Sequence, residues 1–272
     1  MRKKALVLDI DGTLTNSKKE ITEATKKAIW KILEEGHKVI LASGRPTPGM
    51  RRYEKELELE KNGGYLLSYN GANVIECRTG EVVYQRVLPM PIIPKVYKFA
   101  KENGCGLISY LGEQVISAFE PDEYVQLEAR INGLPIKQVD NFPEFIDFEV
   151  HKCLLTATLD KAEELEKQLY EKYKDMVSIY RSEPFFIEVM PKHVDKAASL
   201  DKMLEAIGIP KEDAICCGDG YNDISMIKYA GVGVAMGNAQ PAVKAAADYI
   251  TASNDEDGLV EVIHRFILNQ NS

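Results

Sequence analysis

The stretch LVLDIDGTLT, residues 6–15, places two carboxylates, Asp9 and Asp11, where a short apolar run ends in turn residues. Such a run is typical of a strand that is buried on both faces. Residues two apart in a strand face the same way, but here the strand is ending, so the two side chains can diverge around a common space. Neighbouring carboxylates repel one another unless a cation or a shared proton compensates them. The stretch therefore fits either a plain strand end with a turn or an acidic site.

Similar apolar runs recur along the chain and favour the central strands of a parallel sheet. Helical patterns lie between several of them; in residues 21–36, for example, Thr22 can cap the helix and Gly36 can end it. The sequence therefore predicts an α/β fold, with a doubly wound, Rossmann-like parallel sheet whose ligands lie beyond the carboxyl ends of the strands. The runs are KALVLDID (4–11), HKVILASG (37–44), GYLLSYNG (64–71), DAICCGDG (213–220) and GVGVAMGN (231–238).

The middle of the chain has a different pattern. Helical segments there are separated by alternating or aromatic-rich strands such as EQVISAF, KCLLTATL and SIYRSEPFFIEV, which favours an antiparallel sheet with helices on one face. Prolines cluster near both ends of this segment, as is common at domain junctions. We therefore predict a core domain of residues 1–82 and 189–272 and an inserted α+β domain of residues 83–188.

Charge and cysteine content limit the partners of the chain. With 34 basic and 42 acidic residues the formal net charge is -8, so no overall positive field attracts nucleic acid. Five cysteines without Cys-x-x-Cys spacing favour reduced thiols and a cytoplasmic location. Asp9 and Asp11 interrupt the apolar segment that a signal peptide would need, and no apolar run reaches the roughly 18 residues of a membrane span. We expect neither nucleic acid nor a membrane as a partner.

A second strand end carries groups that can bind an anion. Ser43, Gly44 and Arg45 follow the apolar run of residues 37–42. A hydroxyl group and free backbone amides at such a place make a small anion site. Taken alone, the motif also fits an ordinary turn between a strand and a helix.

A third strand end adds more oxygen ligands. In CCGDGYND, residues 216–223, Asp219 and Asp223 flank a glycine-containing loop that opens a helix, and Asn222 can donate to an anion. Carboxylates at a helix start could merely complement the helix dipole. That alternative weakens because a doubly wound fold gathers all three strand ends at one edge.

A magnesium ion would compensate these carboxylates. Magnesium takes oxygen ligands and prefers one or two carboxylates together with water and substrate phosphate. Asp9 and Asp11, followed by the turn residues Gly12 and Thr13, suit such an ion. Lys196, near a predicted helix start, could supply the cation that limits repulsion between a carboxylate cluster and a phosphate.

In this order, DIDGT, SGR, Lys196 and GDGYND resemble the four motifs of the haloacid dehalogenase (HAD) superfamily, and the resemblance covers almost the whole chain. The details SYNGA, GDGYND and AMGNA resemble the Cof-type sugar phosphatase subfamily, which carries a type IIB cap. The resemblance implies that residues 83–188 form this cap domain, which would close over the site and supply substrate specificity.

The resemblance also implies a role for each motif residue. Asp9 would attack phosphorus to form an aspartyl phosphate that water then releases, and Asp11 would protonate the leaving oxygen and afterwards activate the water. Mg²⁺ would be held by Asp9, the backbone carbonyl of Asp11 and Asp219, with Asp223 in support. The residues implied around the phosphoryl group are Ser43, Gly44, Lys196 and Asn222, with Thr13 and Arg45 in support.

The predicted function is magnesium-dependent hydrolysis of small phosphate monoesters, with sugar phosphates as the expected substrates, by a monomer or weak homo-oligomer. A phosphomutase is an alternative, because an aspartyl phosphate can pass its phosphoryl group to a second sugar hydroxyl. A non-catalytic phosphosugar-binding protein is another. Its expected signature, loss of Asp9, Asp11 or the Lys196 charge, is absent from the sequence.

Overall fold

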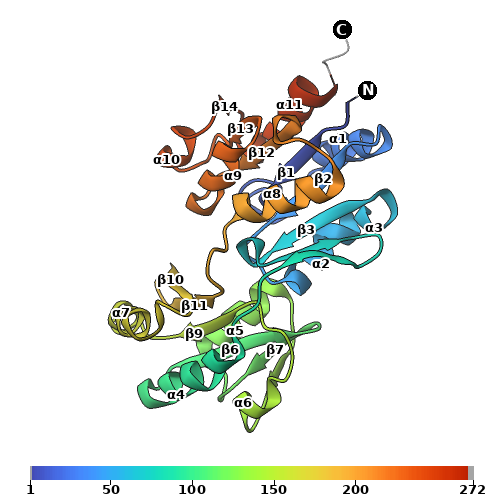
Figure 1. The fold of residues 1–272 in the computed structure, drawn as a ribbon. Coiled ribbons are helices and arrows are strands. Elements are labelled where there is room, and N and C mark those ends of the chain that lie inside the picture. Colours follow the sequence, from blue (N-terminus) through green and yellow to red (C-terminus); the bar gives the residue numbers. More distant parts are fainter. Residues whose placement is uncertain (1, 269–272) are drawn as a thin grey trace. The chain divides into compact units, whose positions relative to one another are not determined.

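The computed structural model describes residues 2–268, which divide into two compact units (Figure 1). The first unit consists of the chain up to Thr47, Arg51–Tyr84 and the chain from Asp195 onward. The second consists of Pro48–Met50 and Gln85–Val194. Each unit is built around its own β-sheet.

The sheet of the first unit has eight strands in the order β14-β13-β12-β1-β2-β3-β4-β5. They are β1 (Ala5–Leu8), β2 (Lys38–Ala42), β3 (Gly64–Ser68), β4 (Asn73–Glu76), β5 (Val82–Gln85), β12 (Ala214–Gly218), β13 (Val232–Ala235) and β14 (Tyr249–Ile250). Parallel pairing runs from β14 through β1 to β3, and β4 is antiparallel to β3. The predicted α/β fold with a parallel-sheet core is confirmed.

The central strands form where the sequence has its apolar runs. All four residues of β1 are fully buried, as expected for a strand that is covered on both faces. Alternate side chains of β1, β2, β3 and β12 pack against α8 (Lys196–Ile207) and α9 (Ile224–Tyr229). The helix α1 (Glu23–Glu34) packs against β2 and α11 (Gly258–Ile263). Its predicted cap is confirmed, because the Thr22 side chain accepts a hydrogen bond from the backbone of Thr25.

Three further α-helices belong to the first unit in whole or in part. They are α2 (Thr47–Glu56, of which residues 48–50 fall in the second unit), α3 (Leu59–Asn62) and α10 (Pro241–Lys244). Single turns of 3₁₀ helix follow two of the strand ends, at Tyr69–Gly71 after β3 and at Tyr221–Asp223 beyond β12. Both turns lie at the carboxyl edge of the parallel sheet, where the predicted site residues also gather.

The sheet of the second unit has the order β10-β11-β9-β6-β7-β8 and is antiparallel except for the pair β7 and β8. Its strands are β6 (Gly106–Leu111), β7 (Gln114–Ser117), β8 (Ile136–Gln138), β9 (Cys153–Thr156), β10 (Ser178–Glu183) and β11 (Phe186–Met190). Its helices are α4 (Ile93–Asn103), α5 (Glu123–Asn132), α6 (Phe142–Phe145) and α7 (Ala162–Tyr173). Leu107 of β6 and Leu155 of β9 pack in one core with residues of α4, α6 and α7.

Two details of this unit differ from the sequence prediction. The helices do not all cover one face: Val125 of α5 packs beside Gly106, and in a strand Gly106 faces away from its neighbour Leu107. The segment SIYRSEPFFIEV is a hairpin rather than one strand, because Pro184 and Phe185 form the turn between β10 and β11. Proline cannot donate to a strand ladder, which explains the break at this point.

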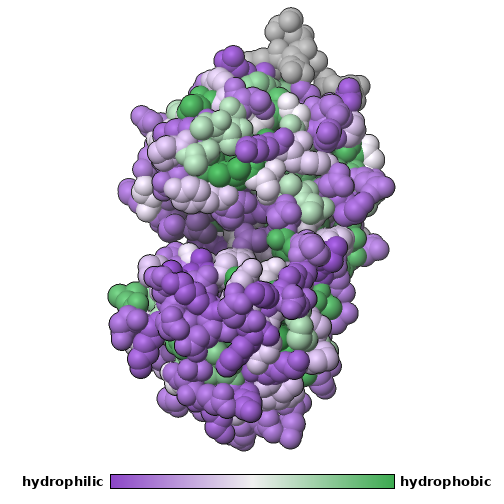
Figure 2. Space-filling view, turned by 60° about the vertical axis from the view of Figure 1, so that its left-hand side comes forward, coloured by the Kyte–Doolittle hydropathy of each residue, from purple (hydrophilic) through white to green (hydrophobic). Residues whose placement is uncertain are grey.

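The surface drawn in Figure 2 is mostly hydrophilic, with hydrophobic residues in separate patches. All five cysteines are buried, and none of them forms a disulfide. Among residues 2–268 no helix has both the length and the apolar character that crossing a membrane requires.

The burial of the central strands predicts a stability difference. Ile40 of β2 is fully buried in the core beneath α8, so Ile40→Ala should lower the free energy of unfolding by about 2–5 kcal/mol and Ile40→Val by about 0.5–1.5 kcal/mol. Urea denaturation followed by circular dichroism measures both values. Ile250, which is 50% exposed, is the control, and Ile250→Ala should stay within about 0.5 kcal/mol of the unchanged protein. Equal effects at the two positions would contradict the packing described here.

Candidate active site

Three parallel strands deliver the predicted site residues to one edge of the sheet. Asp9 directly follows β1, Ser43 follows β2 and Asp219 follows β12. Ligands of doubly wound sheets bind at this edge, beyond the carboxyl ends of the strands. A cavity of about 210 Å³ lies there, lined by Asp9, Asp11, Ser43, Gly44, Arg45, Asp219, Gly220, Asn222 and Asp223.

Lys196 lies behind this cavity with its side chain fully buried. Its ammonium group donates to Asp9 Oδ1 at 2.7 Å, to Asp223 Oδ1 at 2.6 Å and to the carbonyl oxygen of Ala42 at 2.8 Å. An ammonium group has three donors, so all three have protein acceptors. Asp195 caps α8 by accepting hydrogen bonds from two backbone amides of its first turn, which makes Lys196 the first residue of that helix.

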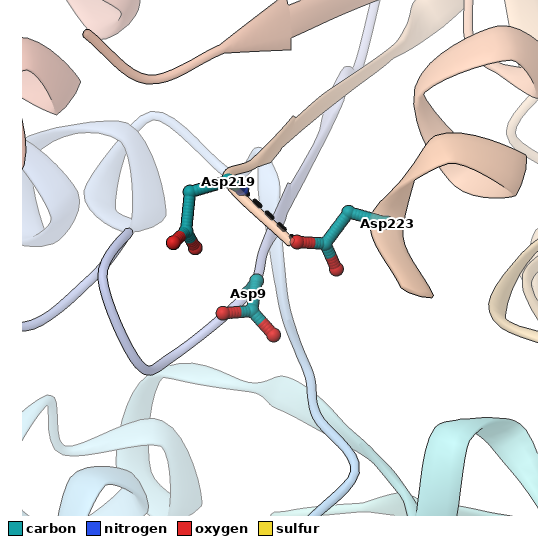
Figure 3. A group of neighbouring side chains, drawn as sticks. All are labelled: Asp9, Asp219 and Asp223. Atoms are coloured by element: carbon teal, nitrogen blue, oxygen red, sulfur yellow. Dashed lines mark hydrogen bonds between the residues drawn. The ribbon is translucent and has the colours of Figure 1, made fainter. Parts of the chain in front are cut away.

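The carboxylates of Asp9, Asp219 and Asp223 face a common space (Figure 3). One oxygen of each lies within 4.8 Å of the others. Asp223 Oδ2 accepts hydrogen bonds from the backbone amides of Asp219, at 3.0 Å, and Gly220, at 2.9 Å. Because its other oxygen accepts from Lys196, Asp223 ties the loop after β12 to the buried lysine.

The turn after β1 approaches this cluster closely. Thr13 Oγ1 donates to Asp219 Oδ1 at 3.1 Å. Gly12 has a φ of +89°, and a Cβ atom there would lie 2.5 Å from Asp219 Oδ2. Any side chain at this position would therefore collide with Asp219 and would also adopt a strained backbone conformation.

Burial and mutual repulsion make the charges of this cluster unfavourable. Burial raises the pKa of Asp9 well above its ordinary value, the neighbouring Asp223 raises it further, and Lys196 opposes both effects. Burial and the charge of Asp223 likewise raise the pKa of Asp219 to about 6. Closely spaced oxygen ligands whose ionised forms are disfavoured fit a divalent cation, because its charge would relieve both effects.

Asp11 has the opposite electrostatic environment. Its carboxylate accepts hydrogen bonds from Arg45 Nε at 2.6 Å, from Arg45 Nη2 at 2.9 Å and from Lys19 Nζ at 3.0 Å. Burial alone would raise the pKa of Asp11, but these two cations outweigh it and lower the pKa to about 2. Asp11 is therefore ionised at neutral pH in this arrangement.

Three of the predicted anion-binding residues, Ser43, Gly44 and Asn222, also line the cavity. Ser43 is buried, and its hydroxyl oxygen accepts a hydrogen bond from the backbone amide of Arg45 at 3.2 Å. The exposed Asn222 donates from Nδ2 to Asn70 Oδ1 at 3.1 Å. All ten residues that the sequence predicted for the site thus line the cavity or, like Thr13 and Lys196, bond to its walls.

Three residues at this edge received no role from the sequence: Lys19, Asn70 and Asn238. Asn70 lies in SYNGA and Asn238 in AMGNA, so motifs marked both positions without indicating a contact. Asn238 Nδ2 donates to the carbonyl oxygen of Gly12 at 2.8 Å. Lys19 lies in an exposed turn, and nothing in its local sequence indicates its contact with Asp11.

Known proteins with the same organisation match over nearly the whole chain. The model of the haloacid dehalogenase-like hydrolase family matches residues 6–263. A relative named "Putative phosphatase YxeH", from Bacillus subtilis (strain 168), is 32% identical over 271 residues, which cover 97% of this chain and 98% of the relative.

Solved structures agree with this assignment. A haloacid dehalogenase-like hydrolase from Bacteroides thetaiotaomicron is 45% identical, with a TM-score of 0.94 over 97% of this chain and 99% of that one. The HAD subclass IIB sugar phosphatase BT4131 is 31% identical, with a TM-score of 0.81 over 97% of this chain and 99% of that one. The chain therefore belongs to the haloacid dehalogenase-like hydrolase family and is a phosphatase of that family.

Proposed function

We propose that the protein is a magnesium-dependent phosphatase of small phosphate monoesters, with sugar phosphates as substrates, and that it works through an aspartyl phosphate on Asp9. The observation that carries this proposal is the environment of Asp9, a buried carboxylate at a strand end. Asp9 accepts a hydrogen bond from Lys196, and one of its oxygens lies within 4.8 Å of a carboxylate oxygen of Asp219 and of Asp223. The sugar phosphate class is supported by the likeness to a sugar phosphatase of subclass IIB.

Asp9 is proposed as the nucleophile. Its Oδ1 accepts the hydrogen bond of Lys196, whereas its Oδ2 accepts none from the described residues. Lys196 would favour the ionised carboxylate against the effects of burial and Asp223, and would fix its orientation. The second oxygen would then be available to attack phosphorus. The bond between phosphorus and the leaving oxygen then breaks, and water later releases phosphate from Asp9 by a second attack at phosphorus.

Asp9, the backbone carbonyl of Asp11 and Asp219 are proposed to hold Mg²⁺, with Asp223 in support. The ion would supply charge stabilisation for the phosphoryl oxygens. Asp223 would maintain the site without binding the ion, because both of its oxygens already accept hydrogen bonds from Lys196 or from the backbone of the loop.

Asp11 is proposed to move the protons. The leaving oxygen needs a proton in the first step, and the attacking water loses one in the second. Because Arg45 and Lys19 hold Asp11 in its ionised form, it suits the second step as it stands. To donate a proton in the first step, Asp11 would first have to take one up from solvent, which requires the carboxylate to separate from at least one of the two cations.

We propose that the phosphoryl group contacts Ser43, the amide of Gly44, Lys196 and Asn222, with Thr13 and Arg45 in support. For its contact, Lys196 would have to release one of its three protein acceptors to the phosphoryl oxygen. We further propose that the second unit is a cap domain that sets substrate specificity.

A phosphate-release screen with Mg²⁺ over sugar phosphates, nucleotides and phosphorylated cofactors would identify the substrate class. Isomerised sugar phosphate without free phosphate would instead indicate a mutase.

The nucleophile makes the first prediction for activity. Asp9→Asn should abolish phosphate release, because an amide oxygen is too weak a nucleophile, while circular dichroism shows an intact fold. Asp11→Asn should leave metal binding largely unchanged and slow release by roughly 10²–10⁴-fold. Undiminished turnover of Asp9→Asn would refute the covalent mechanism.

The metal site makes a prediction for stability. The pKa of the Asp219 carboxyl group is about 6 in the folded protein and about 3.9 in the unfolded chain. Between these pH values the folded state keeps a proton on Asp219 that the unfolded state loses. The metal-free protein should therefore lose stability as the pH rises from about 4 to about 6. Asp219→Asn should weaken this pH dependence and raise the melting temperature of the metal-free protein at pH 7.

The same variant separates metal binding from stability. Mg²⁺ should raise the melting temperature of the unchanged protein, as measured by scanning calorimetry, and should do so much less in Asp219→Asn. The exposed Asp140, in the second unit, is the matched control, and Asp140→Asn should respond to Mg²⁺ like the unchanged protein. An equal response of Asp219→Asn to the ion would remove Asp219 from the metal site.

A further inference from the structure

The loop after β3 has an unusual backbone. Tyr69, Asn70 and Gly71 all have positive φ values, of 51°, 54° and 105°. Positive φ is unfavourable for residues other than glycine, although asparagine tolerates it better than most. Strained backbone of this kind persists only where the surrounding structure holds it, and it is concentrated at functional sites.

Hydrogen bonds hold this loop against the elements of the candidate active site. The backbone amides of Tyr69 and Asn70 donate to the carbonyl oxygens of Arg45 and Ser43, each at 2.9 Å. On the other side, Ser199 of α8 donates to the carbonyl oxygen of Gly71 at 2.7 Å. The loop is thus fixed both to the turn after β2 and to the helix that begins with Lys196.

The strained backbone brings the Asn70 carboxamide between two of the proposed phosphate-binding groups. Its Oδ1 accepts from Asn222 Nδ2 at 3.1 Å. A Cβ atom built on Gly44 would lie 3.2 Å from the same oxygen and 3.3 Å from Nδ2, so the carboxamide packs directly against Gly44. Asn222 is exposed, and an exposed side chain samples several rotamers unless a bond restrains it.

We infer that Asn70 is a positioning residue, which holds Asn222 in the orientation needed to contact a phosphoryl group. The inference rests on the proposed function, since it takes Asn222 as a phosphate ligand. Asn70 acts through Asn222 and need not touch the substrate itself. The positive φ values of the loop are then the strain that this placement requires.

The test separates the carboxamide of Asn70 from its backbone conformation. Asn70→Gly removes the side chain but adopts positive φ readily, whereas Asn70→Ala removes the side chain and disfavours that conformation. The readout is the affinity for inorganic phosphate with Mg²⁺, measured by titration calorimetry, together with melting temperatures. Asn70→Gly should weaken phosphate binding by roughly 3- to 10-fold, the effect of one hydrogen bond. Its melting temperature should equal or exceed that of Asn70→Ala, because glycine adopts the positive φ of this position more readily.

A double-mutant cycle with Asn222→Ala decides whether Asn70 acts through Asn222. In the Asn222→Ala background, Asn70→Gly should cause no further loss of phosphate affinity. Equal losses in both backgrounds, or no loss in either, would overturn the inference. The control is Glu58→Gly, which relieves a similar positive φ of 52° at an exposed position outside the cavity lining and should leave phosphate affinity unchanged.

Failure of this inference is distinguishable from failure of the proposed function. If Asn70→Gly binds phosphate normally while the unchanged protein hydrolyses phosphate esters, only the role of Asn70 is wrong. If the unchanged protein hydrolyses no phosphate ester in the screen, the proposed function itself fails.

Discussion

The rest of the site depends on the three hydrogen bonds that the buried ammonium group of Lys196 donates. This group bonds to Asp9 after β1, to the carbonyl of Ala42 at the end of β2 and to Asp223 beyond β12, and so joins three parallel strands at their carboxyl edge. Two buried carboxylates without this cation would repel one another and face a large desolvation penalty. Both side chains are almost fully buried, so the ammonium group supplies the positive charge that offsets their mutual repulsion.

One cation does not balance the whole cluster. Asp219 adds a third carboxylate, and burial together with Asp223 raises its pKa to about 6. The fold therefore holds an arrangement that is unfavourable by itself but suits a divalent ion and a phosphate, as is common where function is maintained at the expense of stability. Asp11, only two residues beyond Asp9, instead forms ion pairs with Arg45 and Lys19, which compensate its negative charge. Two neighbouring carboxylates of one strand end thus have opposite electrostatic environments.

The central strands and most residues of the candidate site could be predicted from the sequence, because each is indicated by a short continuous stretch of the chain. The apolar runs determined the central strands, and the acidic residues that end them had to meet because parallel strands share one carboxyl edge. The contacts of Lys19 and Asn70 could not be predicted, since both depend on loop conformation. Lys19 contacts Asp11, eight positions away, through a bend of the chain, and Asn70 contacts Asn222 from a distant segment. The position of α5 was missed for a related reason: consecutive residues of β6 are buried, so both faces of the strand are covered, and the sequence does not indicate which helix covers each. The turn at Pro184 had a local signal, which was outweighed by the aromatic residues on both sides.

The central claim, a covalent intermediate on Asp9, is tested most directly by the stereochemical course of the reaction at phosphorus. A substrate whose phosphoryl group is made chiral with oxygen isotopes would be hydrolysed in isotopically labelled water, and the configuration of the released phosphate determined. Attack by Asp9 followed by attack of water comprises two in-line displacements, so the account predicts overall retention of configuration. Inversion would indicate a single direct attack by water and would contradict it.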